Sequence, residues 1–220
     1  MGKDKLQRFA ELETMQRVFQ HPDRIALRDF GMKGKWHSDV FKNKNPLVLE
    51  LGCGRGEYTV ELAQRYPQKN FTGIDIKGAR LWRGAKTINE QQILNAAFLR
   101  IRIELIEHFF GANEVDEIWI TFPDPQLHRA RENKRLTNKA FLDRYRKFLK
   151  PEGIIHLKSD SQELYQYTLE VIRENNCKII YSTNNLYNGQ LPNIDLDIQT
   201  TYERIFQKEG KPITYLCFMV

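Results

Sequence analysis

The fold is decided by the stretch Leu47-Val48-Leu49-Glu50-Leu51-Gly52-Cys53-Gly54-Arg55-Gly56. A short apolar run ends here in an acidic residue, and a G-x-G-x-G turn follows it. Behind the turn, Tyr58, Leu62 and Ala63 recur with the spacing of one helix face. A strand, a tight glycine turn and a helix in this order are typical of the opening βα unit of a doubly wound α/β fold. Glycines suit the turn because the backbone bends sharply there and a Cβ would keep a ligand out of contact distance.

The acid before the turn indicates the kind of ligand. The turn is one residue shorter than the G-x-G-x-x-G of dinucleotide-binding dehydrogenases, and the Glu50 carboxylate would repel a pyrophosphate. A cationic ligand suits this carboxylate better, and S-adenosylmethionine carries a sulfonium and an ammonium group. Pairing of Glu50 with Arg55 or Lys77 within the protein is the alternative.

A second acid tests this interpretation. The strand Asn70-Phe71-Thr72-Gly73-Ile74-Asp75 ends in a carboxylate 23 residues after Gly52. That spacing is close to the roughly 20 residues at which an acid meets the ribose hydroxyls of a nucleotide. Asp75 could instead cap the helix that follows. Because both acids lie in one βαβ unit, they favour adenosylmethionine over a nicotinamide cofactor or no cofactor.

Composition and charge set wider limits. The 220 residues are 41% apolar and 28% charged, enough for one well-buried α/β domain. No apolar run approaches the roughly 20 residues of a membrane span, and the charged start predicts no signal peptide. Cys53, Cys177 and Cys217 lack metal-ligand spacing, so we expect a cytoplasmic protein without a metal site. The net charge of +6 and the pI near 9.2 permit a nucleic-acid partner. Monomer and homodimer both stay open.

We divide the chain into a basic N-terminal extension, residues 1–45, and a cofactor-binding α/β domain, residues 46–220. Within the extension, Phe30 to His37 mixes glycine, basic and aromatic residues, which predicts a loop. Such a loop could lie against a nucleic acid, stacking on bases and binding phosphate. Equally, its aromatic residues could hold the extension against the domain.

Strand and helix patterns alternate along the domain. Strands are predicted at residues 47–51, 70–75, 98–101, 117–121, 154–158, 178–181 and 213–219, and helices at 57–66, 78–91, 105–110, 140–149, 162–174 and 201–206. Alternation of this kind predicts a Rossmann-like, mostly parallel sheet with helices on both faces. The last two strands lack a full crossover between them, which predicts one antiparallel edge strand. Residues 184–197 are polar and are expected to form a surface loop.

The loop after the fourth strand is the strongest candidate for a catalytic site. Ligands of open α/β sheets bind beyond the carboxyl ends of the strands, and Phe122-Pro123-Asp124-Pro125 follows the fourth strand there. Two prolines fix the backbone around Asp124, so its carboxylate has little entropy to lose. The next residues, Gln126 to Arg135, are densely basic. Their place at the mouth of the cofactor site favours phosphate binding over a merely solvated surface.

With these motifs the chain resembles the bacterial tRNA (guanine-N7-)-methyltransferases over nearly its whole length. The motifs that carry the resemblance are Leu49 to Gly56, Gly73 to Arg80, Phe122 to Pro125 with its basic continuation to Asn138, Ser159-Asp160, and Thr200 to Glu203. The Asp-Pro loop with its basic tail is quite specific, whereas many methyltransferases share the glycine turn. The resemblance implies a class I methyltransferase fold, with residues 46–220 as the S-adenosylmethionine-dependent methyltransferase domain. It also implies transfer of a methyl group from S-adenosylmethionine to N7 of a guanine in the variable loop of tRNA.

The resemblance assigns roles to single residues. Glu50 and Asp75 match the cofactor-binding acids beside Gly52 and Gly54, and Asp124 matches a residue placed at both cofactor and target base and taken as catalytic. The positions implied to bind the substrate are His128, Asp160, Thr200, Thr201, Tyr202 and Glu203. The segment implied to contact RNA is Ala130 to Arg135. From the place of the basic run beside the Asp-Pro loop, we expect Arg129, Arg131, Lys134 and Arg135 to bind RNA phosphates.

Three positions depart from the family pattern. Gln126 stands where the family usually has Trp, and His128 where it usually has Lys. Arg102 falls at a cofactor position where an acid or amide usually reaches the adenine amine. Arginine only donates hydrogen bonds and cannot accept one from that amine. A backbone carbonyl or another side chain is therefore needed for adenine recognition.

The implied chemistry suits these residues. Guanine N7 carries a lone pair and no proton, so attack on the methyl group needs no general base, and in-line positioning remains. A carboxylate can bind guanine through its N1–H and exocyclic amine, and Asp124, Asp160 and Glu203 are the candidates. The methylated base becomes cationic, so a nearby carboxylate also stabilises the transition state. Two other functions stay open: a methyltransferase for a small molecule or protein, and a non-catalytic RNA-binding protein on the same scaffold.

Overall fold

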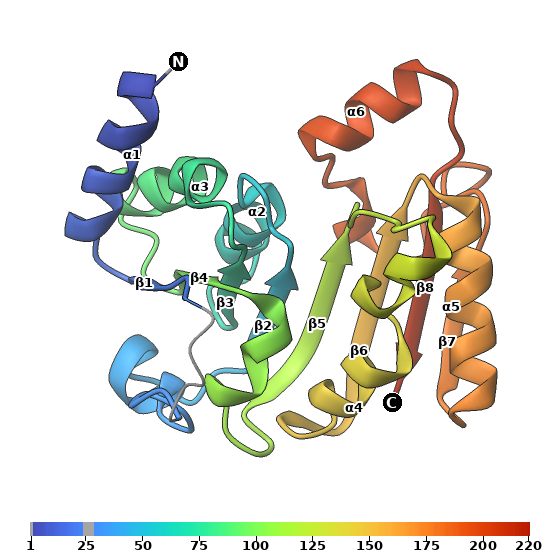
Figure 1. The fold of residues 1–220 in the computed structure, drawn as a ribbon, viewed down its shortest axis with the longest axis horizontal. Helices are drawn as coiled ribbons and strands as arrows, with labels where there is room; N and C mark the ends of the chain where they lie inside the picture. The colour runs from blue at the N-terminus through green and yellow to red at the C-terminus, as the bar shows by residue number, and fades with distance from the viewer. Residues whose placement is uncertain (1, 24–28) are drawn as a thin grey trace.

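The computed structural model describes residues 2–23 and 29–220 and is built around an eight-stranded sheet (Figure 1). The strands follow the spatial order β1-β4-β3-β2-β5-β6-β8-β7. Their bounds are β1 (Val18–His21), β2 (Leu47–Leu51), β3 (Asn70–Ile74), β4 (Ala96–Ile101), β5 (Val115–Thr121), β6 (Leu149–Ser159), β7 (Lys178–Thr183) and β8 (Thr214–Met219). All pairings from β1 across to β6 are parallel, which confirms the predicted doubly wound sheet.

The antiparallel strand is β8, and it lies one place inside the edge. It pairs antiparallel with β6 on one side and with β7 on the other, so β7 forms the edge itself. The chain reaches β8 only after the long excursion through residues 184–213. That excursion crosses the carboxyl ends of the parallel strands before the chain returns down the sheet (Figure 1). The topology therefore brings a late segment of the sequence to the carboxyl ends of the strands, where ligands bind in such sheets.

Helices cover both faces of the sheet, as predicted. The longer helices are α1 (Gly2–Thr14), α2 (Glu57–Arg65), α3 (Gly78–Glu90), α4 (Lys139–Tyr145), α5 (Gln162–Glu174) and α6 (Thr201–Lys208). The short ones are η1 (Trp36–Phe41), η2 (Ile103–His108), η3 (Arg129–Lys134) and η4 (Ile194–Asp197). None of the helices described is long and apolar enough to cross a membrane.

The side chains of β2 show how the two faces are assigned. Leu47, Leu49 and Leu51 belong to an apolar cluster with η1, α4 and α5, whereas Val48 belongs to a cluster with α1, α2 and α3. Successive residues of a strand point to opposite faces, so Glu50 faces α2. Because both faces are buried, β2 is apolar at nearly every position, as is usual for a central parallel strand.

The N-terminal extension takes part in the same sheet. β1, which the sequence did not indicate, pairs in parallel with β4, and α1 packs on α3. Trp36 is wholly buried and donates from its ring nitrogen to the Phe109 carbonyl at 2.8 Å. Of the two interpretations of residues 30–37, the structure therefore supports the packing one for Trp36, and stacking of its ring on a nucleic acid is wrong. The division at residue 45 stays a prediction.

The segment from 184 to 197 was expected to be a surface loop, and this is wrong for its end. Asp195 and Leu196 are buried within η4, and the Asn193 side chain accepts a hydrogen bond from the Asp195 amide at 3.0 Å. Asp195 and Asp197 accept hydrogen bonds from Tyr66 and Arg65, and the Leu196 backbone carbonyl accepts one from Lys158 on β6, so these polar groups bond within the protein. The polarity of the sequence alone did not distinguish a solvent-exposed loop from a segment whose polar groups bond within the protein.

Candidate functional site

The glycine turn after β2 combines an open side and a packed side. Gly52 and Gly54 have φ angles of 73° and 56°, and a Cβ added to either would meet nothing closer than 4.0 Å. Gly56 has a φ of 71°, and a Cβ there would lie 2.5 Å from the Phe98 ring. All three positions require the left-handed conformation that glycine adopts without strain. Gly56 is thus needed for packing, while Gly52 and Gly54 leave space above the turn for a ligand.

Glu50 lies buried beneath this turn. Its Oε2 accepts hydrogen bonds from the Thr59 amide at 2.9 Å and the Thr59 hydroxyl at 2.5 Å, and its Oε1 accepts from the Thr121 hydroxyl at 2.9 Å. These neutral donors, and not Arg55 or Lys77, hold the carboxyl group among the described residues. Burial raises the pKa of Glu50 to about 7. A cationic ligand next to this group would lower the pKa again and favour the carboxylate.

Asp75 fastens the end of β3 to the glycine turn. Its Oδ2 accepts from the Gly54 amide at 3.0 Å, and its Oδ1 accepts from the Lys77 amide at 2.8 Å at the start of α3. The carboxylate therefore orders the turn and the helix start together. Each carboxylate oxygen can accept more than one hydrogen bond, so both oxygens keep capacity for a ligand hydroxyl.

The loop that carries Asp124 is conformationally strained at both ends. Phe122 and Gln126 have φ angles of 47° and 48°, which bulky residues rarely adopt. Asp124 is exposed, and its Oδ1 accepts from the Gln126 amide at 3.1 Å. Strain of this kind persists only where surrounding contacts impose it and is concentrated at functional sites. The loop thus presents a carboxylate to solvent in a fixed orientation.

Arg135 supplies one of those contacts. Its Nε donates to the carbonyls of Pro125 at 3.2 Å and Gln126 at 3.3 Å, and its guanidinium lies 4.2 Å from the centre of the Tyr167 ring. The side chain is 9% exposed. In this arrangement Arg135 braces the Asp124 loop and differs from the rest of the basic run. Its expected contact with RNA is not supported by its position.

The remaining basic residues lie on the surface. Arg129, Arg131 and Lys134 belong to η3, in which no residue is buried, and His128 precedes η3 and is also exposed. The described part of the chain places no acidic partner within ion-pair distance of these arginines or of Lys134. Their charges are available to an anionic partner.

Thr200 to Glu203 form the start of α6, as the sequence predicted. The Thr200 hydroxyl accepts from the Glu203 amide at 3.1 Å and caps the helix. Thr201 donates from its amide at 2.9 Å and from its hydroxyl at 2.5 Å to the two carboxylate oxygens of Glu57 on α2. Tyr202 is 42% exposed, and the Arg80 guanidinium lies 5.7 Å from its ring centre. These contacts fix α6 above the carboxyl ends of the strands.

Among residues 200–203, Glu203 is fully buried within the protein. It is 0% exposed and pairs with Lys158 on β6, with 2.8 Å between Nζ and Oε1. The Tyr187 hydroxyl donates to the same Oε1 at 2.5 Å. Asp160, two residues after Lys158, is only partly buried, and burial raises its pKa. Of the three carboxylates considered for guanine, Asp124 and Asp160 thus face the surface and Glu203 does not.

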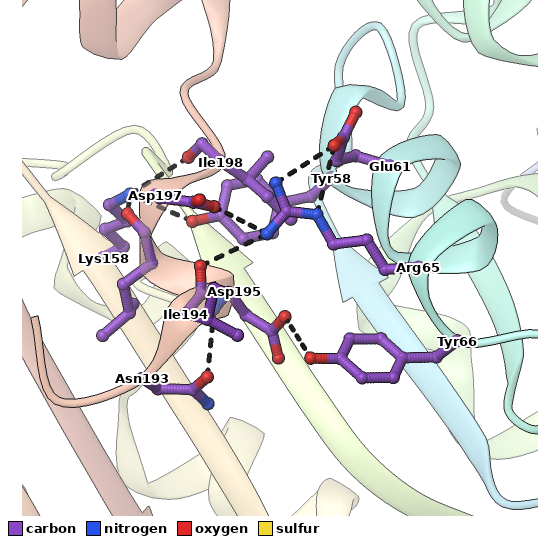
Figure 2. Close-up of polar contacts among 11 residues, drawn as sticks. Tyr58, Glu61, Arg65, Tyr66, Lys158, Asn193, Ile194, Asp195, Asp197 and Ile198 are labelled. Carbon is purple, nitrogen blue, oxygen red and sulfur yellow. Dashed lines mark hydrogen bonds and ion pairs between the residues drawn. The ribbon is translucent and has the colours of Figure 1, made fainter.

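A network of polar contacts ties the 193–198 segment to α2 and β6 (Figure 2). Arg65 on α2 donates to the Asp197 carboxylate at 2.6 Å, and the Tyr66 hydroxyl donates to Asp195 at 2.7 Å. On the other side, Lys158 donates to the Ile198 carbonyl at 3.2 Å. The sequence showed none of these contacts, because their partners are more than a hundred residues apart for α2 and about 40 for β6.

The matches to known proteins agree with this architecture. The family described as "Putative methyltransferase" matches residues 44–216. The tRNA (guanine-N(7)-)-methyltransferase of Christiangramia forsetii is 52% identical, over 100% of this chain and 99% of the relative. The enzyme of the same name from Bacteroides thetaiotaomicron is 49% identical, over 99% of this chain and 86% of the relative. The chain belongs to the tRNA (guanine-N(7)-)-methyltransferase family.

Solved structures with low sequence identity support the fold of this tRNA (guanine-N(7)-)-methyltransferase family member. The 16S rRNA methyltransferase KamB aligns with a TM-score of 0.64 and 13% identity, covering 94% of this chain and 99% of that chain. A SAM-dependent methyltransferase from Aquifex aeolicus aligns with a TM-score of 0.55 and 14% identity, covering 86% and 95%. At such identities the likeness concerns the fold alone.

Arg102 departs from the family pattern, and no contact within the described structure accounts for an arginine at this position. It follows β4 directly, and its Nε is buried without a hydrogen-bond partner in the described structure. A buried donor without an acceptor costs free energy. The position is therefore compatible with a ligand that supplies an acceptor. As for metals, no group of three or more His, Cys, Asp or Glu side chains within residues 2–23 and 29–220 is placed to hold one.

Proposed function

We propose that this protein transfers a methyl group from S-adenosylmethionine to N7 of a guanine in the variable loop of tRNA. The observation that carries the proposal is the family membership over the full chain together with the open glycine turn between two acids. Glu50 and Asp75 stand at the ends of adjacent parallel strands, and Gly52 and Gly54 leave room above them. Such an edge is where ligands bind in open α/β sheets.

The residues present suit adenosylmethionine. Asp75 can accept from the ribose hydroxyls, the open turn admits a ligand to the backbone, and Glu50 provides negative charge below it. The bound cofactor supplies an activated methyl group on a sulfonium ion. Arg102 lies beside the adenine in this proposal, and because it cannot accept a hydrogen bond from the exocyclic amine, that amine is left to a backbone carbonyl or another side chain.

Catalysis in this proposal rests on positioning. Guanine N7 needs no proton removed, so the rate depends on holding the lone pair in line with the methyl group. Asp124 sits on a loop braced by Arg135 and strained at Phe122 and Gln126, which fixes its carboxylate. That carboxylate orients the base and offsets the positive charge that develops on the ring.

The tRNA backbone is bound by the exposed basic residues. Arg129, Arg131 and Lys134 lie on η3, directly after the Asp124 loop, so phosphates held there bring the base to the strand ends. His128 and Asp160 flank the same edge, and Tyr202 offers an exposed aromatic ring for stacking. Three cysteines without disulfide partners suit a reducing cytoplasm.

A methylation assay tests the proposal. Labelled methyl transfer from adenosylmethionine to bulk tRNA is measured, the tRNA is digested, and the nucleosides are separated. We expect 7-methylguanosine at a single variable-loop position. Methyl transfer only to a protein or small molecule would contradict the proposal. Calorimetry with adenosylmethionine separates the remaining alternative, because a non-catalytic RNA-binding protein on this scaffold would not bind the cofactor.

A further inference from the structure

A lysine that the sequence did not single out is buried near the carboxyl end of β6, in contact with the 196–203 segment. Lys158 is the tenth residue of β6, next to the carboxyl end of the strand, and it is 0% exposed. Leu157 belongs to the apolar cluster on the α5 face of the sheet. Strand alternation therefore turns Lys158 to the opposite face, toward α2 and the 196–203 segment. A buried lysine without acceptors would be strongly destabilising.

All three N–H groups of the Lys158 ammonium are used. They donate to the Tyr58 hydroxyl at 3.0 Å, the Leu196 carbonyl at 2.9 Å and the Ile198 carbonyl at 3.2 Å. An ammonium has three donors, whereas a neutral amine has two. The three acceptors and the adjacent Glu203 carboxylate thus require a charged lysine. Figure 2 shows the Lys158 side chain with dashed lines to the Tyr58 hydroxyl and to the 193–198 segment.

Among the described residues, only one of the two carboxylate oxygens of Glu203 has interaction partners. Glu203 Oε1 accepts from the Tyr187 hydroxyl and forms an ion pair with the Lys158 ammonium, whereas Oε2 is buried without a hydrogen-bond partner in the described structure. A buried carboxylate oxygen left unpaired is costly, and such atoms are rare in folded proteins. Oε2 is therefore an unused acceptor on a residue that matches a substrate-binding position, and because the atom is enclosed, the chain around it must open for a guanine to reach it.

Each member of the pair depends on the other for its charge. Burial raises the pKa of Glu203 and lowers that of Lys158, and the attraction between the two groups opposes both shifts. The charge of Glu203 matters for recognition because only an ionised carboxylate can accept from both N–H groups on the guanine edge. A protonated Glu203 would present a donor in place of one acceptor.

We propose that Lys158 is a positioning residue for tRNA methylation, which holds the 196–203 segment on β6 and keeps Glu203 ionised with Oε2 available to an N–H donor of the substrate guanine. The inference rests on the proposed function, since it gives Glu203 a role in binding the base. Lys158 itself touches neither cofactor nor base and acts through Glu203 and the two carbonyls.

The principal test is Lys158→Met, which keeps the length and apolar character of the side chain and removes the charge. We expect kcat/KM for tRNA to fall about tenfold or more, since loss of one partner leaves a buried charge uncompensated. The loss should appear mainly in KM, and in the Kd for tRNA measured without cofactor. Relative to wild type, kcat/KM of the variant should recover as the pH is raised, because Glu203 then ionises without its lysine.

Two further variants make the test decisive. Lys158→Met combined with Glu203→Gln removes both charges, so folding does not depend on an unpaired buried ion. This double variant should be no worse than Glu203→Gln alone and should lose the pH dependence. Lys69→Met is the matched control, because Lys69 pairs with Glu117 at 3.1 Å away from α6. It should keep the wild-type kcat/KM.

The outcomes separate this inference from the proposed function. A folded Lys158→Met protein with wild-type kcat/KM and pH profile overturns the inference, and so does a double variant whose loss is the product of the two single losses. Wild-type methylation of tRNA is measured first. A wild-type protein inactive on tRNA overturns the proposed function and this inference with it, whereas active wild type with an insensitive Lys158 overturns the inference alone.

Discussion

The Oδ2 atom of Asp75 lies 3.0 Å from the amide nitrogen of Gly54, so the acid at the end of β3 directly orders the glycine turn at the end of β2. Neighbouring parallel strands place the two side by side, since Leu51 pairs with Ile74 one residue before Asp75. The acid that we expect at the ribose therefore also shapes the loop beside it. Its removal should affect the cofactor through both contacts.

Asp75→Ala is expected to weaken adenosylmethionine binding by on the order of tenfold to a hundredfold. The variant removes a charge-assisted hydrogen-bond acceptor, which is worth about 1.5–3 kcal/mol, and it frees the Gly54 amide. Calorimetric titration of the folded variant with adenosylmethionine measures the effect, with the exposed Asp39→Ala as the control. Unchanged affinity would mean that the ribose does not bind at the end of β3.

Asp124→Asn should lower kcat by more than tenfold and leave the melting temperature almost unchanged. Asn is nearly isosteric with Asp, and Asp124 is exposed on a loop held by other residues, so the fold does not depend on the charge. Steady-state kinetics with tRNA and thermal unfolding give the two quantities. Turnover near the wild-type rate would pass the role of guanine carboxylate to Asp160 or Glu203.

Arg102→Asp should raise the affinity for adenosylmethionine. The change removes a buried Nε that has no partner in the described structure and restores the acid that the family pattern places there, which can accept from the adenine amine. Titration of wild type and variant under the same conditions compares the two dissociation constants. If affinity stays the same or falls, Arg102 makes a favourable contact with the cofactor itself.

Arg131→Ala with Lys134→Ala should raise KM for tRNA and flatten the salt dependence of log K by roughly 1.5, because each lost phosphate contact removes about 0.7–0.9 from the slope. Affinity for adenosylmethionine should not change, and guanine should remain the methylated base. Arg135→Ala is the contrasting variant. Since Arg135 braces the Asp124 loop, it should lower kcat and keep the wild-type salt slope. A wild-type slope in the double variant would show that η3 is not the RNA surface.

The buried pair of His156 and Glu117 predicts how stability depends on pH. Nε2 of His156 lies 3.2 Å from Oε1 of Glu117. Although burial acts to lower it, interactions with Cys217 and Glu117 raise the pKa of His156 to about 8, from 6.5. Burial likewise opposes the pairing with His156 and Lys69 that lowers the pKa of Glu117 to about 2, from 4.5.

The directions of these two pKa shifts define the pH range in which the pair stabilises the fold. The His156 contribution is complete below pH 6.5 and is lost as the pH rises through about 8, whereas the Glu117 contribution is complete above pH 4.5 and is lost as the pH falls through about 2. Unfolding free energy measured in denaturant should therefore decline between pH 6.5 and pH 9. His156→Gln should remove most of that decline. An unchanged slope in the variant would assign the decline to other groups.

Much of the site followed from local sequence. The glycine turn, the acids at the ends of β2 and β3, and the Asp-Pro loop after β5 lie where the pattern predicted. Parallel strands with helical crossovers must bring their carboxyl ends to the same side of the sheet. An acid or a turn that follows a predicted strand can therefore be placed at that side from the sequence alone. The Thr200 cap likewise depends on local sequence alone, because a capping hydroxyl bonds within one helical turn.

Only the tertiary structure decided which polar residues are exposed and which are buried. Arg135 and Arg131 belong to one basic run, yet Arg135 braces the Asp124 loop from inside while Arg131 faces solvent. Glu203 and Lys158 are 45 residues apart, and their pairing is wholly buried. Hydrophobic periodicity and turn residues encode local geometry, whereas the burial of a charge depends on a partner brought from elsewhere in the chain, which no local pattern specifies.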